Sequence, residues 1–201
     1  MPETTRPPVR QRLLRAERLR QLIETARRIV REEGADALTL GRLAESAGVT
    51  RPVVYDHFQT RNGLLKALYE DYDARREVVL LATLKAAPQT LEGRAQAIAR
   101  TYIECVLSEG SDIPGVAASL AGSPELEAFR RDYQQRFIAR CRAELEPHLH
   151  DRPIAPARLW AMLGAADALS EAVLRGDLRP AEAESELVRL MLSFAEEPRP
   201  S

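Results

Sequence analysis

The 201-residue sequence predicts an all-α protein of about nine helices. Proline residues and potential N-cap residues divide the chain into segments of helical length, and no segment alternates apolar and polar residues as a half-buried strand does. Even the apolar run at 78–81 lies between helix formers rather than turn residues. In the first segment, apolar residues recur at the spacing of an amphipathic helix: Leu19, Leu22, Ile23, Ala26, Ile29 and Val30.

The predicted helices follow one another with recognisable start and stop signals. The first ends near Gly34, a residue suited to a helix C-terminus. Thr39, Thr50 and Thr60 can cap the next three helices, at 40–47, 51–57 and 61–86. Ser123-Pro124-Glu125 is a strong start signal, because it combines a capping hydroxyl, a proline that needs no donor, and an acid at the positive end of the helix dipole. The other helices are expected at 91–109, near 114–120, and at 124–146, 156–175 and 180–197.

Composition excludes several classes of protein. Hydrophobic residues make up 45% of the chain and charged residues 29%, which argues against both a disordered and a fibrous protein. The longest uncharged run, 113–124, is 12 residues long, whereas a membrane helix needs about 20. The Arg-rich N-terminus lacks the apolar stretch of a secretory signal, so we expect a cytoplasmic protein that does not contact a membrane. Cys105 and Cys141 have no disulfide or zinc-site spacing and are expected as buried, reduced thiols.

Charge is distributed unevenly along the chain, although the net charge is only −1. Residues 1–66 contain 13 lysines and arginines against 8 aspartates and glutamates, whereas residues 67–201 contain 16 against 22. A basic N-terminal part on an acidic body favours contact between that part and a polyanion. A solvated basic surface is the alternative.

The segment 39–58, TLGRLAESAGVTRPVVYDHF, has the spacing of a helix-turn-helix. Ala44 lets the two short helices cross closely, and Gly48 permits the bend between them. The small core between the helices is filled by Leu43, Val49 and Val54. The second helix would present polar, cationic and aromatic side chains that suit phosphates and base edges. An ordinary helix corner with a glycine is the structural alternative.

The stretch from Ala16 to Tyr72 resembles the DNA-binding domain of the TetR (tetracycline repressor) family of bacterial transcription regulators. The resemblance covers about 57 of the 201 residues, and its motifs are Gly34-Ala35-Asp36-Ala37-Leu38-Thr39, Leu43-Ala44-Glu45-Ser46-Ala47-Gly48-Val49, Val54-Tyr55-Asp56-His57-Phe58 and Leu64-Leu65. The rest of the chain resembles the family only in its pattern of helices. The resemblance implies a homodimer whose C-terminal domain binds a small molecule that releases the protein from its operator.

The resemblance also implies roles for individual residues. The recognition helix carries Thr50, Arg51, Pro52, Val53, Tyr55 and His57. Tyr55 and His57 match positions that contact phosphates, whereas Arg51 and Val53 match positions that read bases. Arg61 matches a basic residue that grips a phosphate with the help of the helix dipole at the start of the fourth helix. The hydroxyl at the start of the second helix is matched by Thr39.

Two positions depart from the family pattern. Val53-Val54 makes the recognition helix stiffer and more apolar, which favours contact with thymine methyl groups. Gly63 replaces the usual glutamate of a capping box begun by Thr60, which is expected to weaken the start of that helix.

Residues 1–15 are predicted to be a disordered, Arg-rich arm. The arginines of the arm and of the turn that follows are Arg6, Arg10, Arg12, Arg15, Arg18 and Arg20. Arginine favours the narrow minor groove, so the arm either lies in the groove beside the recognition site or forms a solvated surface.

A helix-turn-helix DNA-binding domain at 16–66 is expected to precede a ligand-binding and dimerisation domain at 67–201. Helices of the second domain carry residues that can line a cavity, although a plain hydrophobic core is the alternative. These residues are Tyr102, Cys105, Val106, Phe129, Tyr133, Phe137, Trp160 and Leu163. Asp167 is added as a carboxylate on an otherwise apolar face, where it needs either a cationic ligand group or a partner arginine.

The last two long helices are the candidates for a homodimer interface. Their apolar residues are Leu159, Met162, Leu163, Ala166, Leu169, Val173, Leu187, Leu190, Met191 and Phe194. Gly164-Ala165-Ala166 is small enough for close approach of another helix, and pairing with a second copy would make a four-helix interface. Packing of the same helices onto their own chain is the alternative.

Together these features predict a DNA-binding transcription regulator, a repressor that a small-molecule ligand releases from a palindromic operator. The sequence contains no GxSxG, P-loop, HExxH or Gly-rich nucleotide turn, so we expect no catalytic residue, cofactor or metal. The loop with His148, His150 and Asp151 is interpreted as solvated rather than as a metal site. The alternative function is a helical adaptor that uses the same motif to bind protein.

Overall fold

The computed structural model describes residues 14–109, 116, 124–149 and 153–196, and every regular element within them is helical. The α-helices are α1 (Arg15–Glu33), α2 (Leu40–Ala47), α3 (Arg51–Phe58), α4 (Arg61–Ala86), α5 (Leu91–Glu109), α7 (Pro124–Leu145), α8 (Pro156–Arg175) and α9 (Pro180–Leu192). Three short 3₁₀ turns lie at Ala35–Ala37, Glu146–His148 and Ser193–Ala195. The all-α prediction is confirmed.

Some predicted features fall outside the described residues. They include residues 1–13 of the predicted arm, most of the short helix expected near 114–120, and the side chains of His150 and Asp151. Arg15, which the sequence assigns to the arm, is instead the first residue of α1.

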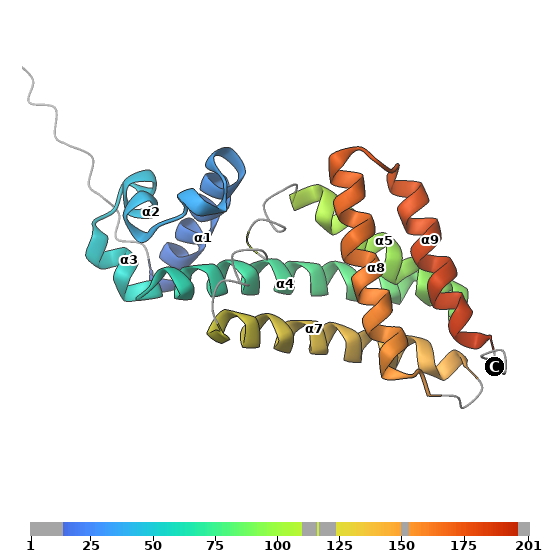
Figure 1. Cartoon of the computed structure of the whole chain (residues 1–201). Helices are drawn as coiled ribbons and strands as arrows, with labels where there is room; N and C mark the ends of the chain where they lie inside the picture. The colour runs from blue at the N-terminus through green and yellow to red at the C-terminus, as the bar shows by residue number, and fades with distance from the viewer. Residues whose placement is uncertain (1–13, 110–115, 117–123, 150–152, 197–201) are drawn as a thin grey trace, which may run out of the picture.

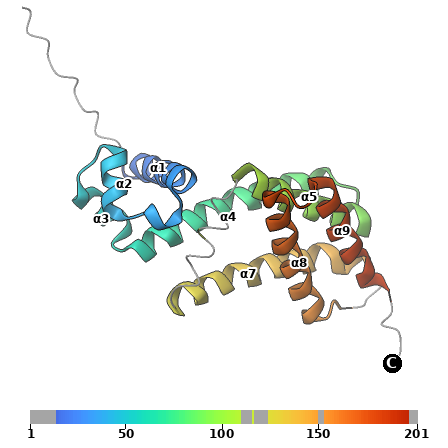
Figure 2. The same cartoon turned by 45° about the horizontal axis from the view of Figure 1, so that its top comes forward.

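One long helix connects two groups of helices (Figure 1). Helices α1, α2 and α3 lie together at one end, and α4 runs from this group into a second group formed by α5, α7, α8 and α9. The view in Figure 2 shows the same separation, with α7 running alongside α4. The 26 residues of α4 therefore reach both groups.

The corners of the N-terminal group follow from their sequence. Thr39 Oγ1 accepts a hydrogen bond from Arg42 N at 3.1 Å, and Gly48 adopts the left-handed conformation at φ 65° that ends α2. Thr60 Oγ1 accepts from Gly63 N at 3.0 Å and so caps α4. A Cβ on Gly63 would lie 2.1 Å from the Phe58 carbonyl oxygen, so the α3–α4 corner requires glycine there. A glutamate at position 63 could complete the capping box, but its Cβ would collide with the Phe58 carbonyl oxygen.

Two hydrophobic clusters fill the molecule, and α4 contributes to both. Leu64, Leu65 and Leu68 pack with α1, α2 and α3, whereas Leu80 and Leu84 pack with α5, α7, α8 and α9. The first cluster also includes Leu126 of α7 and has Phe129 and Tyr133 of α7 packed against it. The beginning of α7 is therefore part of the N-terminal core.

The apolar residues of α8 and α9 are mostly used within this chain. Leu159, Met162, Ala166, Leu187 and Met191 are buried in the second cluster. The opposite face of α8 is exposed and consists of Trp160 beside three small residues, Ala161, Gly164 and Ala168. A Cβ on Gly164 would meet no atom within 4 Å. Among the described helices, none is long and apolar enough to cross a membrane.

Candidate functional site

Helix α3 presents an exposed polar and aromatic surface at one end of the molecule (Figure 1). Its residues Val54 and Phe58 are buried against the neighbouring helices, which turns Arg51, Pro52 and Tyr55 outward. Tyr55 is 51% exposed, while Val53 and His57 are partly buried. Thr50 precedes the helix without making a side-chain cap, so its hydroxyl is not used to hold the helix end.

Two predicted contact residues have partners within the N-terminal group. Arg61 donates from Nε to the Leu38 carbonyl at 2.9 Å and from Nη2 to the Ala35 carbonyl at 3.0 Å. It therefore ties the start of α4 to the turn between α1 and α2. Thr39 is exposed, but its hydroxyl oxygen caps α2. The side chain of Arg61 is 39% exposed despite these bonds.

The imidazole of His57 is held in its neutral form more strongly than in a free histidine. Burial lowers its pKa from the ordinary 6.5, and the charges of Arg15 and Arg18 lower it further, whereas Asp56 raises it. A polyanion placed against this surface would add negative charge and raise the pKa again. His57 is thus a group whose proton uptake can report binding.

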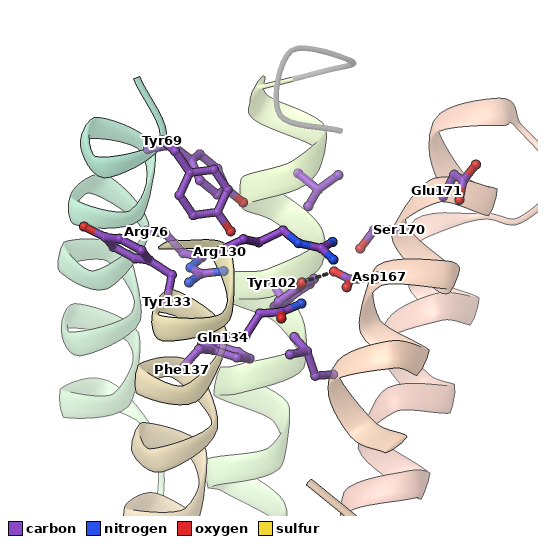
Figure 3. A pocket seen from close by; sticks show the side chains of 13 residues that line it. Tyr69, Arg76, Tyr102, Arg130, Tyr133, Gln134, Phe137, Asp167, Ser170 and Glu171 are labelled. Atoms are coloured by element: carbon purple, nitrogen blue, oxygen red, sulfur yellow. Dashed lines mark hydrogen bonds between the residues drawn. The ribbon is translucent and has the colours of Figure 1, made fainter. Parts of the chain in front are cut away.

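A cavity of about 260 Å³ lies inside the second group of helices (Figure 3). We call it the central pocket. Four helices line it: α4 with Tyr69, Tyr72 and Arg76, α5 with Tyr102 and Val106, α7 with Arg130, Tyr133, Gln134 and Phe137, and α8 with Leu163, Asp167, Ser170 and Glu171. Its walls combine aromatic rings with two arginines and two carboxylates, so it suits a ligand that is both apolar and polar.

A buried arginine forms part of the pocket wall. The guanidinium of Arg76 pairs with Asp73 at 2.5 Å and lies 4.6 Å from the ring centroid of Phe137. It is also within 6 Å of the ring centroids of Tyr72 and Tyr102. Charge pairing and cation–π contacts therefore compensate for the burial of this cation.

Asp167 projects from α8 into the central pocket, where Tyr102 donates a hydrogen bond from its hydroxyl to Asp167 Oδ1 (Figure 3). Of the two partners expected for Asp167, an arginine is not within ion-pair distance in the described residues, and the bonded partner is this phenol. Burial raises the pKa of Asp167 above its ordinary value. Tyr102, Arg76 and Arg130 lower the pKa, but by less than burial raises it. Burial and the charge of Asp167 raise the pKa of Tyr102 well above its ordinary value, so Tyr102 remains a donor.

Three residues predicted for the cavity lie elsewhere. Phe129 packs against the N-terminal cluster, with its ring 6.0 Å from that of Tyr69 and Lys66 Nζ 5.6 Å from its centroid. Trp160 is 42% exposed on the outer face of α8. Cys105 is buried beside a separate depression next to α4. Each is on a predicted helix, but Phe129 lies one turn before Tyr133, where α7 packs against the N-terminal group, and Trp160 and Cys105 lie outside the pocket lining.

The other six predicted residues do line the central pocket: Tyr102, Val106, Tyr133, Phe137, Leu163 and Asp167. Sequence reasoning missed the contribution of α4 and most of the polar lining. Tyr69, Tyr72 and Arg76 continue the apolar stripe of Leu65 and Leu68 at helical spacing, a pattern that is visible in the sequence. Arg130 and Gln134 flank Tyr133 and Phe137 at the same spacing on α7.

Comparison with known proteins agrees with this arrangement. Residues 22–68 match the model for bacterial regulatory proteins of the tetR family. Over 82 residues the chain is 35% identical to the HTH-type transcriptional regulator BetI of Escherichia coli, a match that covers 40% of this chain and 42% of that relative. The alignment therefore spans less than half the length of the curated relative.

Solved structures extend the similarity to nearly the whole chain at the level of fold. A putative TetR-family transcriptional regulator from Rhodococcus sp. has a TM-score of 0.76 at 17% identity, covering 90% of this chain and 100% of that one. The regulator FadR from Bacillus subtilis, solved with stearoyl-CoA, has a TM-score of 0.73 at 14% identity, covering 87% and 98%. The N-terminal domain of this chain is therefore similar to that of the tetR family of bacterial regulatory proteins, and its helices are arranged as in the solved regulators.

Proposed function

We propose that this protein is a DNA-binding transcription regulator, a repressor that a small-molecule ligand releases from a palindromic operator. One observation carries the proposal: α4 joins an exposed helix-turn-helix surface directly to the central pocket. The DNA contacts would come from α3 and from residues at the starts of α2, α3 and α4. Arg51 and Val53 would lie at base edges, and Tyr55, His57 and Arg61 at phosphates. Thr39, Thr50 and Pro52 would also contact DNA. The names of the relatives as transcription regulators support the same function.

Release by a ligand would act through α4 and α7. Tyr69 of α4 and Tyr133 of α7 line the pocket and also pack against the N-terminal cluster. Lys66 of α4 pairs with Glu125 of α7 at 2.5 Å closer to the DNA-binding end. A ligand that shifts these two helices would change the position of α3. Converting a complex that is about 99% bound into one that is about 99% released requires a preference of roughly 5.5 kcal/mol for the released state.

The protein would act as a homodimer, with α8 as the main contact. The exposed face around Trp160 and Gly164 permits close approach of a second α8. Because Ala183, Leu187 and Met191 of α9 are buried in its own chain, α9 would contribute from its edge. The two α3 helices would then lie in successive major grooves, about 34–36 Å apart.

The chain would divide functionally near residue 66, within α4. Residues 16–66 would contact DNA, residues 67–201 would bind the ligand and the second copy, and residues 1–15 would add contacts with phosphates. Such a regulator would work in the cytoplasm, where its operator is.

The proposal is tested by selecting bound sequences from a random duplex library and titrating the selected duplex at several salt concentrations. A regulator should enrich a palindrome, and the logarithm of its affinity should fall steeply with the logarithm of salt concentration, by about 0.9 per phosphate neutralised. The alternative of a protein-binding adaptor predicts no enriched sequence and weak, uniform binding to every duplex. That outcome would reject the regulator.

A further inference from the structure

A buried hydroxyl without a partner opens onto the central pocket. Ser170 is only 4% exposed and lines the cavity. Its Oγ has no hydrogen-bond partner among the described residues. A buried hydroxyl that lacks a hydrogen bond costs free energy, so this group is suited to a polar ligand atom. Ser170 lies one helical turn from Asp167, so the two side chains offer a hydroxyl and a carboxylate to one ligand group.

The opposite wall of the pocket provides a cation. Arg130 and Gln134 extend from α7 toward Asp167 and Ser170 of α8 (Figure 3). Within the described part of the chain, Arg130 forms no ion pair or hydrogen bond, although its charge lowers the pKa of Asp167. Asp167 likewise has no cation within ion-pair distance there, and its Oδ2 accepts no hydrogen bond. The guanidinium of Arg130 and the carboxylate of Asp167 therefore face each other across the cavity, and each can still form hydrogen bonds with a ligand.

The charges that line the pocket are balanced. Arg76 is neutralised by Asp73, and Glu171 at the rim pairs with Arg175 at 2.5 Å. Arg130 and Asp167 remain as one charge of each sign. A purely cationic or purely anionic ligand would satisfy one of them and leave the other next to an uncompensated charge in a partly enclosed site. A ligand with both charges would satisfy both residues.

Size and wall chemistry restrict the ligand further. The cavity of about 260 Å³ is smaller than the roughly 300–1,000 Å³ typical of sites for drug-sized ligands. Tyr69, Tyr133 and Phe137 provide aromatic surface beside the charged groups. The pocket thus has room for one apolar side chain next to a compact pair of opposite charges.

We propose that the central pocket binds a small zwitterion of the α-amino-acid type with an aromatic or branched apolar side chain. The ligand carboxylate pairs with Arg130, its ammonium group donates to Asp167 and Ser170, and its side chain contacts the aromatic wall. In an α-amino acid both charged groups are attached to one carbon, which suits an arginine and an aspartate on facing helices. The proposal rests on the proposed function in treating this cavity as the effector site of the regulator.

Three probes with the same phenyl group test the charge requirement: L-phenylalanine, the anion 3-phenylpropanoate and the cation 2-phenylethylamine. Calorimetric titration of the full chain without DNA should give an affinity for L-phenylalanine, or for another aromatic or branched L-amino acid, at least about tenfold above that for its matched ions. Equal or tighter binding of the anion or the cation would overturn the proposal. So would the absence of binding by every aromatic and branched amino acid at millimolar concentration.

Variants assign each charge to its partner. Asp167→Asn and Arg130→Gln should each weaken binding of the amino acid by about tenfold or more, and Asp167→Asn should not weaken binding of 3-phenylpropanoate. Arg131→Gln is the matched control, because it removes the neighbouring exposed arginine of α7 and should leave affinity within about twofold. Circular dichroism establishes that each variant is folded. Equal losses in all three variants would contradict the assignment.

Measurement without DNA separates this inference from the proposed function. If an amino acid binds as expected but leaves DNA affinity unchanged, the ligand class stands and the regulatory role fails. If the selected operator is bound with steep salt dependence and only a compound of another charge class releases it, the regulatory role stands and the ligand class is overturned.

Discussion

At the scale of single residues, the two arginines predicted to contact DNA, Arg51 and Arg61, are held differently. Arg51 is exposed at the start of α3, with its guanidinium lying along Gly41 of α2, where an added Cβ would be 3.7 Å from Nη2. Arg61 is bonded to the backbone carbonyls of Leu38 and Ala35. One side chain is thus free to reach a base, whereas the other supports the frame that holds α2.

This difference predicts different effects of removing each arginine. Arg51→Ala should reduce discrimination at one base position by about 1–3 kcal/mol, because the lost contact is to a base edge. Arg61→Ala should weaken binding to all sequences about equally and lower the salt slope by about one per half-site. It should also lower the free energy of unfolding by about 1–2 kcal/mol, since two carbonyls lose their donor. The measurements are titrations with the operator and with operators carrying single base changes, together with urea unfolding. Equal, sequence-independent losses of affinity in the two protein variants would show that Arg51 does not read a base.

His57 predicts a pH dependence of DNA binding. Its pKa in the free protein lies below 6.5, because burial and the nearby Arg15 disfavour the proton. A bound phosphate favours the proton, so the pKa in the complex is higher than in the free protein. Affinity gained by proton uptake is therefore fully present below the free pKa and is lost as pH rises through the pKa of the complex.

Operator affinity should consequently rise as the pH falls from about 7.5 to about 5.5. The increase should be at most about tenfold per pH unit for each His57 that takes up a proton. His57→Gln should remove this dependence, whereas His148→Gln, a change far from α3, should retain it. Fluorescence anisotropy at constant ionic strength measures the effect, and an unchanged pH profile in His57→Gln would exclude the phosphate contact.

At the scale of helices, sequence patterns predict where a helix begins and ends better than they predict which neighbour each face of the helix contacts. Caps and prolines act locally, so the ends of α2, α4 and α8 agree with their signals within one residue. Which neighbour a helix face meets depends on packing between distant segments. Periodicity alone therefore could not turn Phe129 toward the N-terminal cluster or Trp160 toward the outside, and it could not reveal that Tyr102 would be the partner of Asp167.

The exposed face of α8 predicts the oligomeric state. Gly164→Arg places a long charged side chain where no atom lies within 4 Å in the single chain, so folding should be unaffected. The same side chain would prevent two α8 helices from approaching, and the protein should become monomeric at micromolar concentration and lose affinity for a palindromic duplex. Ala82→Arg, on an exposed part of α4, should remain a dimer. Sedimentation velocity measures both, and a dimeric Gly164→Arg protein would place the interface elsewhere.

At the scale of the whole molecule, α4 is the shared element of both clusters. Its 26 residues correspond to a rod of about 39 Å at 1.5 Å per residue. Near its start Lys66 pairs with Glu125 of α7, and farther along Tyr69 and Tyr133 bring their rings within 5.5 Å of each other. Helices α4 and α7 thus contact each other at two positions along their length, which favours their movement as one unit.

The inclusion of Leu126 in the N-terminal core has a practical consequence for building hybrid sensors. A chimera that cuts α4 after the helix-turn-helix and grafts a foreign sensing body behind it would remove Leu126 and the packing of Phe129 and Tyr133. Leu65, Leu68 and Tyr69 would then face whatever the donor offers in place of α7. A working hybrid needs matching apolar residues in the first turns of the donor's helix that replaces α7. Exchange of the DNA-binding domain is therefore constrained by a helix that lies about sixty residues farther along the chain.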